Sequence, residues 1–269
     1  MGFDVIVELN YGDNNITYAN RSHPLGAIGM TPDGRRFRYA LNGGTALEAG
    51  KIVQAFAANA DLSGNATVFV TAGSTVASGV STISILPTTG VAAGYGRGGY
   101  LAVQTSGAAR SVYKVSENPN GQAASGSSAN AITLTLAEGE RLVAPVTTAS
   151  RLALLRNPYS SVIVAPAILT AAVIGVPTVA VPANRYFWAQ SQGYAAVEYN
   201  AGVQAAETGH AIQPDTSIAG AFKGFPSDSG APLTTGASGQ LDFIDQPIIG
   251  WADVVGADAL INGVQLNIP

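Results

Sequence analysis

The segment Ile132-Thr133-Leu134-Thr135-Leu136 places an aliphatic side chain at every second position, with threonine between. Successive side chains of an extended chain point to opposite faces of a sheet, so three aliphatic groups share one face and two hydroxyl groups the other. Leucine, isoleucine and threonine in this order are typical of a half-buried strand. The segment therefore predicts a β-strand, and its pattern can be followed through the rest of the chain.

The same alternation predicts further strands. It recurs in three more segments: Val5, Val7 and Leu9; Phe37, Tyr39 and Leu41; Val264, Leu266 and Ile268. Turn-forming residues separate such segments, at Pro32-Asp33-Gly34, Asn42-Gly43-Gly44, Asn118-Pro119-Asn120-Gly121 and Asn262-Gly263. Residues 45–58 are the best helical candidate, but Gly50 weakens a helix, and a pair of strands around a turn fits equally. We predict an all-β fold of antiparallel β-sandwich or β-barrel-like lobes, with an extended N-terminal arm and little helix.

Changes in composition divide the chain into three predicted parts. Residues 10–20 are polar and rich in asparagine, which favours an arm over residues 1–30 that becomes ordered against a partner. An ordinary first core strand is the alternative. A β-rich lobe over 31–160 and a C-terminal β-barrel-like lobe over 161–269 follow.

Two pairs of segments within the chain resemble each other. Residues 100–107 resemble 186–193, as an aromatic-led strand running into a glycine turn, and residues 49–54 resemble 208–213. One strand–turn–strand element is therefore expected to recur.

One stretch is apolar and long enough to span a bilayer, at residues 162–183. It contains Pro166, Pro177 and Pro182, and proline removes a backbone donor and blocks helix geometry. We therefore expect extended chain here and a soluble protein without membrane contact. The N-terminus shows no basic segment followed by an apolar run, so we expect no secretory signal.

The composition favours a protein that is covered by other subunits. Only 11% of residues are charged, against about 25% in an ordinary soluble protein. A protein surface with so few charges is easier to explain if neighbouring subunits bury part of it. The net charge is −4, and the 13 lysines and arginines are scattered. A nucleic-acid surface needs a basic stripe, so we expect no nucleic-acid partner.

The chemistry-bearing residues form no convincing active site. Ser227-Asp228-Ser229-Gly230-Ala231-Pro232 resembles the nucleophile loop of chymotrypsin-type serine proteases, which also need a histidine base and an orienting acid. His23 and His210 are the two histidines, and neither has that family's sequence context. Residues 94–99 are glycine-rich without the lysine and helix of a phosphate loop. With no cysteine and no Asp-x-Asp-x-Asp loop, we predict no metal site, no cofactor and no enzymatic activity.

Six segments, in order, resemble a family of structural proteins of tailed phages, the capsid decoration or cement proteins. The segments are residues 34–40, 47–51, 132–136, 156–159, 179–190 and 247–252. They include Gly34-Arg35-Arg36-Phe37-Arg38-Tyr39-Ala40 and Pro247-Ile248-Ile249-Gly250-Trp251-Ala252. The C-terminal third also resembles β-barrel-like decoration folds, in which an alanine–glycine turn recurs.

The resemblance implies a virion protein on the outer capsid surface, with the major capsid protein and its own copies as partners. A homotrimer is expected, because decoration proteins often occupy threefold positions of the shell. Val5, Val7, Leu9, Trp188 and Trp251 are the predicted partner contacts, and both tryptophans are interpreted as core or subunit-contact residues. A tail-associated or fibre-associated receptor-binding protein is the alternative, and a trypsin-like serine protease is a remote one.

Overall fold

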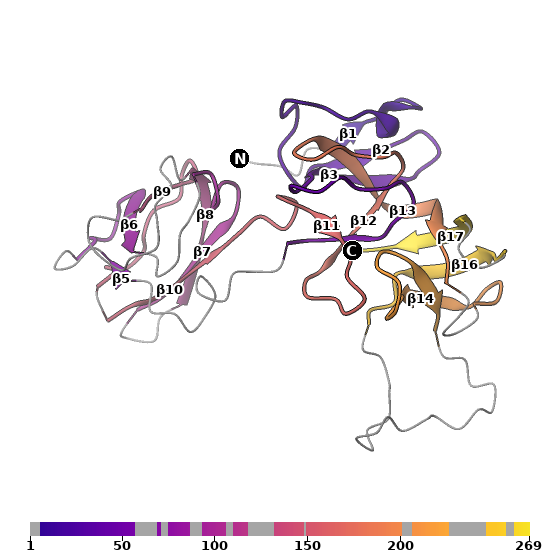
Figure 1. The fold of residues 1–269 in the computed structure, drawn as a ribbon. Helices are drawn as coiled ribbons and strands as arrows, with labels where there is room; N and C mark the ends of the chain where they lie inside the picture. Colours follow the sequence, from indigo (N-terminus) through magenta and orange to yellow (C-terminus); the bar gives the residue numbers. More distant parts are fainter. Residues whose placement is uncertain are drawn as a thin grey trace, which may run out of the picture. The chain divides into compact units, whose positions relative to one another are not determined.

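The computed structural model describes residues 6–56, 69–70, 75–86, 93–105, 110–117, 132–147, 149–200, 206–225, 246–256 and 261–269. The chain divides into two compact units (Figure 1). Unit 1 comprises residues 1–56 and 158–269, and unit 2 comprises residues 57–157. Unit 2 is therefore an insertion between two segments of unit 1.

Unit 1 is built around one large sheet. Its strands are β1 (Ile6–Glu8), β2 (Ile28–Met30), β3 (Arg36–Leu41), β4 (Val53–Gln54), β11 (Ile163–Val164), β12 (Val173–Pro177), β13 (Tyr186–Glu198), β14 (Ala211–Pro214), β15 (Phe222–Gly224), β16 (Gly250–Val254) and β17 (Ile261–Asn267). Among the described residues their order is β1-β2-β3-β13-β17-β16-β14-β15, with β12 pairing β13 and β4, and β4 pairing β11. The pairings are antiparallel except for the parallel pair β1 and β2.

Unit 2 contains a separate antiparallel sheet. Its strands are β5 (Phe69–Val70), β6 (Thr82–Leu86), β7 (Tyr100–Gln104), β8 (Arg110–Glu117), β9 (Ile132–Leu136) and β10 (Arg151–Leu155), in the order β10-β7-β8-β9-β6-β5. The described residues contain no helix besides the short 3-10 turn η1 (Asp13–Asn15). The all-β prediction is confirmed. Within the same residues, no helix has the length and apolar character needed to cross a membrane.

The domain boundaries differ from the predicted lobes over 31–160 and 161–269, because long-range pairing joins residues 31–56 to the C-terminal part. Asn42 illustrates the connection. Its side chain is buried, and its Nδ2 donates to the backbone oxygens of Thr45 at 2.9 Å, Val181 at 3.1 Å and Pro182 at 2.9 Å. Leu47 and Val181 also exchange two backbone hydrogen bonds of 2.9 Å. These contacts hold the segment after β3 against the segment before β13.

Each unit has cores of its own. In unit 2, strands β6 to β10 all contribute to one buried cluster, for example through Ile83, Leu101, Val115, Leu134 and Leu154. The alternation in residues 132–136 is confirmed, because Ile132, Leu134 and Leu136 are buried whereas Thr133 is exposed. The described residues of unit 1 form three clusters, and β13 contributes to every one of them.

Several local expectations can be compared with the structure. Residues 45–56 are not helical but form a turn followed by β4, the alternative of two extended segments. Residues 162–183 are not helical, and they contain the strands β11 and β12 joined by bends and loop. The echoed turns at Gly50 and Gly209 both have positive φ, 77° and 86°, and each is followed by a strand. The prediction of a glycine turn at Gly193 is wrong, because Gly193 lies inside β13.

Residues 6–30 combine two short strands, β1 and β2, with turns and the 3-10 turn η1, and they are part of unit 1 rather than a separate arm. Leu9 is 5% exposed and packs with Phe37, Tyr39 and Trp188. Gly29 makes this packing possible, because a Cβ there would lie 2.6 Å from Leu9 Cδ1 and 2.8 Å from Trp188 Cζ3. The side chain of Leu9 thus fills a space that the sequence leaves open on β2.

Because Leu9 is a core residue and Ile6 is exposed, shortening each side chain to alanine should change the free energy of unfolding by different amounts. Leu9→Ala should lower the free energy of unfolding of the isolated chain by about 2–4 kcal/mol, as deletion of a buried aliphatic side chain does. Ile6→Ala, at a side chain that is 58% exposed in β1, should change it by less than about 1 kcal/mol. Urea unfolding measures both. Equal, small effects of the two substitutions would instead favour an N-terminal arm that contributes nothing to the stability of the isolated protein.

Candidate functional site

The most distinctive part of unit 1 is the place where β13 changes neighbours. Its first half pairs with β3, from Tyr186 opposite Leu41 to Gln192 opposite Arg36, and its second half pairs with β17, beginning with Gln192 opposite Asn267. The register with β3 shifts between Gln190 and Gln192, so Ser191 is an extra residue in the ladder. Such a β-bulge bends the strand and redirects the side chains that follow.

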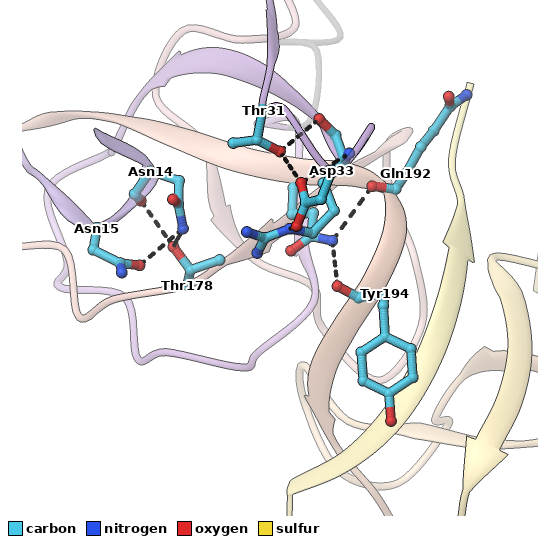
Figure 2. Close-up of polar contacts among 9 residues, drawn as sticks. Asn14, Asn15, Thr31, Asp33, Thr178, Gln192 and Tyr194 are labelled. Carbon is cyan, nitrogen blue, oxygen red and sulfur yellow. Dashed lines mark hydrogen bonds and ion pairs between the residues drawn. The ribbon is translucent and has the colours of Figure 1, made fainter. Parts of the chain in front are cut away.

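Gln190 holds the backbone beyond this bulge. Its side chain is 1% exposed, and its Nε2 donates to the backbone oxygen of Tyr194 at 2.8 Å and of Gln192 at 3.3 Å (Figure 2). Carbonyls freed by a bulge need partners when they are buried. The amide of Gln190 supplies them from the same strand, so it positions the backbone that carries Tyr194.

Beyond the bulge, β13, β17 and β16 present a face that no described segment of unit 1 covers completely. Tyr194 pairs with Gln265, which pairs with Trp251, and paired residues project from the same side of a sheet. The next row joins Ala196, Gly263 and Val254. We call these six residues the open face: Tyr194, Ala196, Trp251, Val254, Gly263 and Gln265.

The open face is aromatic and largely accessible. Tyr194 is 50% exposed, Trp251 44% and Val254 57%. On the opposite side of the same strands, Val197 and Leu266 are buried in a core cluster. Isolated exposed apolar residues are ordinary, whereas aromatic groups gathered on one sheet face are typical of surfaces that bind another protein.

Packing fixes the orientation of Tyr194. Its ring lies across Gly263 on the neighbouring strand, where an added Cβ would collide with the tyrosine hydroxyl. A glycine inside a strand often marks such a close approach. Because the ring rests on the sheet, Tyr194 presents a broad and comparatively rigid apolar surface.

The charges closest to the open face are partly neutralised within the chain. The side chain of Arg35 lies over Gly193, and its Nε donates to Asp33 Oδ2 at 2.8 Å (Figure 2). A hydrogen bond from Thr31, together with those from Arg35, lowers the pKa of the Asp33 carboxyl below its ordinary value. Asp253 is exposed on β16 and has no ion pair among the described residues. The open face itself contains no ionisable group other than the tyrosine hydroxyl, so apolar burial would dominate a contact there.

The predicted contact residues differ in how accessible they are to a partner. Leu9 and Trp188 are buried, at 5% and 1% exposure, and therefore are not available to a partner in this structure. Leu9, which follows β1, and Trp188 in β13 pack in one core cluster with Phe37 and Tyr39. Val7 is half-buried in β1, and Val5 lies outside the described residues. Trp251 is the predicted contact that is accessible.

Sequence reasoning missed Tyr194 and Val254. The alternation of Tyr194 and Ala196 with Ala195 and Val197 was a usable signal for Tyr194. No comparable signal marks Val254, because a register shift between Ala252 and Val254 breaks the alternation of β16.

The candidate catalytic residues give no assembled site among the described residues. Ser229 lies outside them. His23 packs against the rings of Tyr39 and Trp188, with centroids 5.2 and 5.4 Å away. His210 lies in the turn before β14, where its Nε2 is 3.7 Å from Glu207 Oε2. Where the structure describes the chain, no group of three histidine or acidic residues could hold a metal ion.

Comparison with protein-family models, with curated proteins and with solved structures finds no match to this chain. Its function must therefore be argued from its own residues.

The bridging role of Gln190 predicts a loss of stability that a neighbouring glutamine does not share. Gln190→Leu roughly keeps the side-chain volume but removes both hydrogen bonds, so the backbone carbonyls of Gln192 and Tyr194 lose this partner in a part-buried position. The free energy of unfolding should fall by about 1–3 kcal/mol. Gln192→Leu is the matched control, because Gln192 is half-exposed and donates no side-chain hydrogen bond among the described contacts. Urea unfolding that gave the same change for both variants would contradict this role.

Proposed function

We propose that the chain is a structural protein of a tailed-phage particle, a decoration or cement protein that binds the outer capsid surface and bridges neighbouring capsid subunits. The open face is the observation that supports this most strongly. It is an aromatic sheet surface in a chain with few charges, which suits binding by burial of apolar area. We place the contact with the major capsid protein there.

The division into two units also supports bridging. A cementing protein must hold two neighbours at once, and a chain of two bodies with separate cores can contact two subunits. Each contact adds to the free energy needed to separate the neighbours, and many copies multiply the effect. No catalysis is required. We further propose that the chain associates with itself, as a trimer at threefold positions of the shell.

Rebinding to particles assembled without this protein tests the proposal. Wild-type chain should bind them to saturation and raise the temperature at which the shell breaks open. The double variant Tyr194→Ala, Trp251→Ala should bind at least about tenfold more weakly, because aromatic anchors at the centre of an interface typically contribute more than 1 kcal/mol each. The double variant Tyr11→Ala, Ile16→Ala is the matched control, with side chains 66% and 45% exposed elsewhere in unit 1.

Each other outcome has a distinct meaning. Equal binding by both double variants would remove the open face from the contact. Binding to tails but not to shells would favour the receptor-binding alternative. Labelling of the pure protein by a serine-directed phosphonate, lost in Ser229→Ala, would favour the protease.

A further inference from the structure

The outer face of β10, β7 and β8 in unit 2 combines an apolar centre with unpaired positive charges. Strand register gives three rows across the strands: Arg151–Gln104–Arg110, Ala153–Ala102–Val112 and Leu155–Tyr100–Lys114. We call these nine residues the basic face. The opposite side of the same strands is the core of unit 2, with Leu101 and Leu152 buried. The basic face is therefore the outer surface of this sheet.

The apolar residues of the basic face are accessible. Val112 is 61% exposed, Tyr100 41% and Leu155 40%. Between them lie the small side chains of Ala102 and Ala153, each half-buried. The middle of the basic face is thus apolar and formed by short side chains, and longer side chains surround it. A second protein surface could pack against such a centre.

Within the part of the chain that the structure describes, the three cations of the basic face have no carboxylate partner. None of Arg110, Lys114 and Arg151 forms an ion pair with a described residue, and Lys114 instead lies 4.1 Å from the centroid of the Tyr100 ring. The face carries no acidic residue at all. Its ligand should therefore be an acidic surface.

The chain itself contains a unit of this net charge. Residues 1–56 and 158–269 contain seven basic and thirteen acidic residues, a net charge of −6, whereas residues 57–157 contain six basic and four acidic residues, a net charge of +2. In unit 1, Glu8, Glu48 and Asp253 are exposed and form no ion pair among the described residues. The two units of one chain thus have opposite net charges, and complementary charge guides association and fixes orientation.

We infer that the basic face of unit 2 docks onto the acidic surface of unit 1 in a second copy of the chain. This contact joins two different surfaces, so its repetition leaves every subunit equivalent. The repeat closes into a ring when the rotation between neighbours divides a full turn, as the proposed trimer requires, and forms an open filament when it does not. The inference rests on the self-association in the proposed function and identifies the surface responsible. Three cations around an apolar centre also argue against nucleic acid, which requires a longer basic track.

Self-association of the isolated full-length chain tests the inference without phage particles. Mass measurement in solution up to about 100 μM should find oligomers at 50 mM salt, and their dissociation constant should rise about tenfold or more at 500 mM salt, because exposed charges are screened. The triple variant Arg110→Glu, Lys114→Glu, Arg151→Glu should be monomeric. The control Arg21→Glu, Arg141→Glu, Arg185→Glu alters exposed cations outside the basic face by the same total charge, and should still associate.

Cross-linking identifies the surface on the second copy. The chain contains no cysteine, so Val112→Cys provides a single site for a photoreactive label. With mixed isotope-labelled and unlabelled chains, intermolecular cross-links should map to residues 1–56 or 158–269. Cross-links confined to residues 57–157 would overturn the inference, as would a monomeric wild type or equal behaviour of the two triple variants. If the glutamate variant does not fold, as judged by circular dichroism, the corresponding glutamine variant replaces it with the same expectation.

The result is distinguishable from failure of the proposed function. A chain that forms these oligomers but does not bind particles would refute the capsid assignment alone. A chain that binds particles through the open face but remains monomeric would refute this inference alone.

Discussion

The pairing of β13 with β3 over its first half and with β17 over its second half is the constraint on which unit 1 depends. The strand begins against β3 and ends against β17, and its side chains enter all three core clusters of the unit. Trp188 faces the N-terminal segment, Phe187 the cluster around β4 and β12, and Val197 the C-terminal strands. The bulge at Ser191 makes this possible by bending one continuous strand. The side-chain amide of Gln190 donates hydrogen bonds to the backbone carbonyls of Gln192 and Tyr194 just beyond it. A change at the bulge would therefore disturb both the core and the open face.

Strand alternation made the fold class and several strands predictable from sequence. Residues 36–39, 132–136 and 264–268 alternate between buried and more exposed positions, as expected for strands with one face against a core. In β3 the alternation ends at Ala40, which is buried like Tyr39 before it. Gly50 and Gly209 were also recognisable as turns. These features are local: neighbouring residues decide them, and long-range partners change them little.

The insertion of unit 2 and the candidate site could not be predicted in the same way. No pattern near Tyr39 reveals that it pairs with Trp188, almost 150 positions later. Trp188 and Trp251 lie in similar alternating segments, yet one is a core residue and the other is exposed, because different elements lie opposite them. Gly193 resembles a turn residue in sequence, but β17 and the side chain of Arg35 hold it within a strand. Burial of this kind depends on tertiary pairing.

Two surfaces of different character give the two units different proposed tasks. The open face on unit 1 has no charged side chain and contains two large aromatic groups, so its contact should depend little on salt. The basic face on unit 2 has three cations, so its contact should be sensitive to salt. In the proposed function, the open face contacts the shell and the basic face contacts a neighbouring copy.

The most direct test of a capsid-bound role is electron cryomicroscopy of purified phage particles with and without this protein. The proposed function predicts additional density on the outer surface of the shell, repeated at equivalent lattice positions, into which both units fit, with Tyr194 and Trp251 facing the capsid protein. An identical shell in both maps, or additional density confined to the tail, would contradict it.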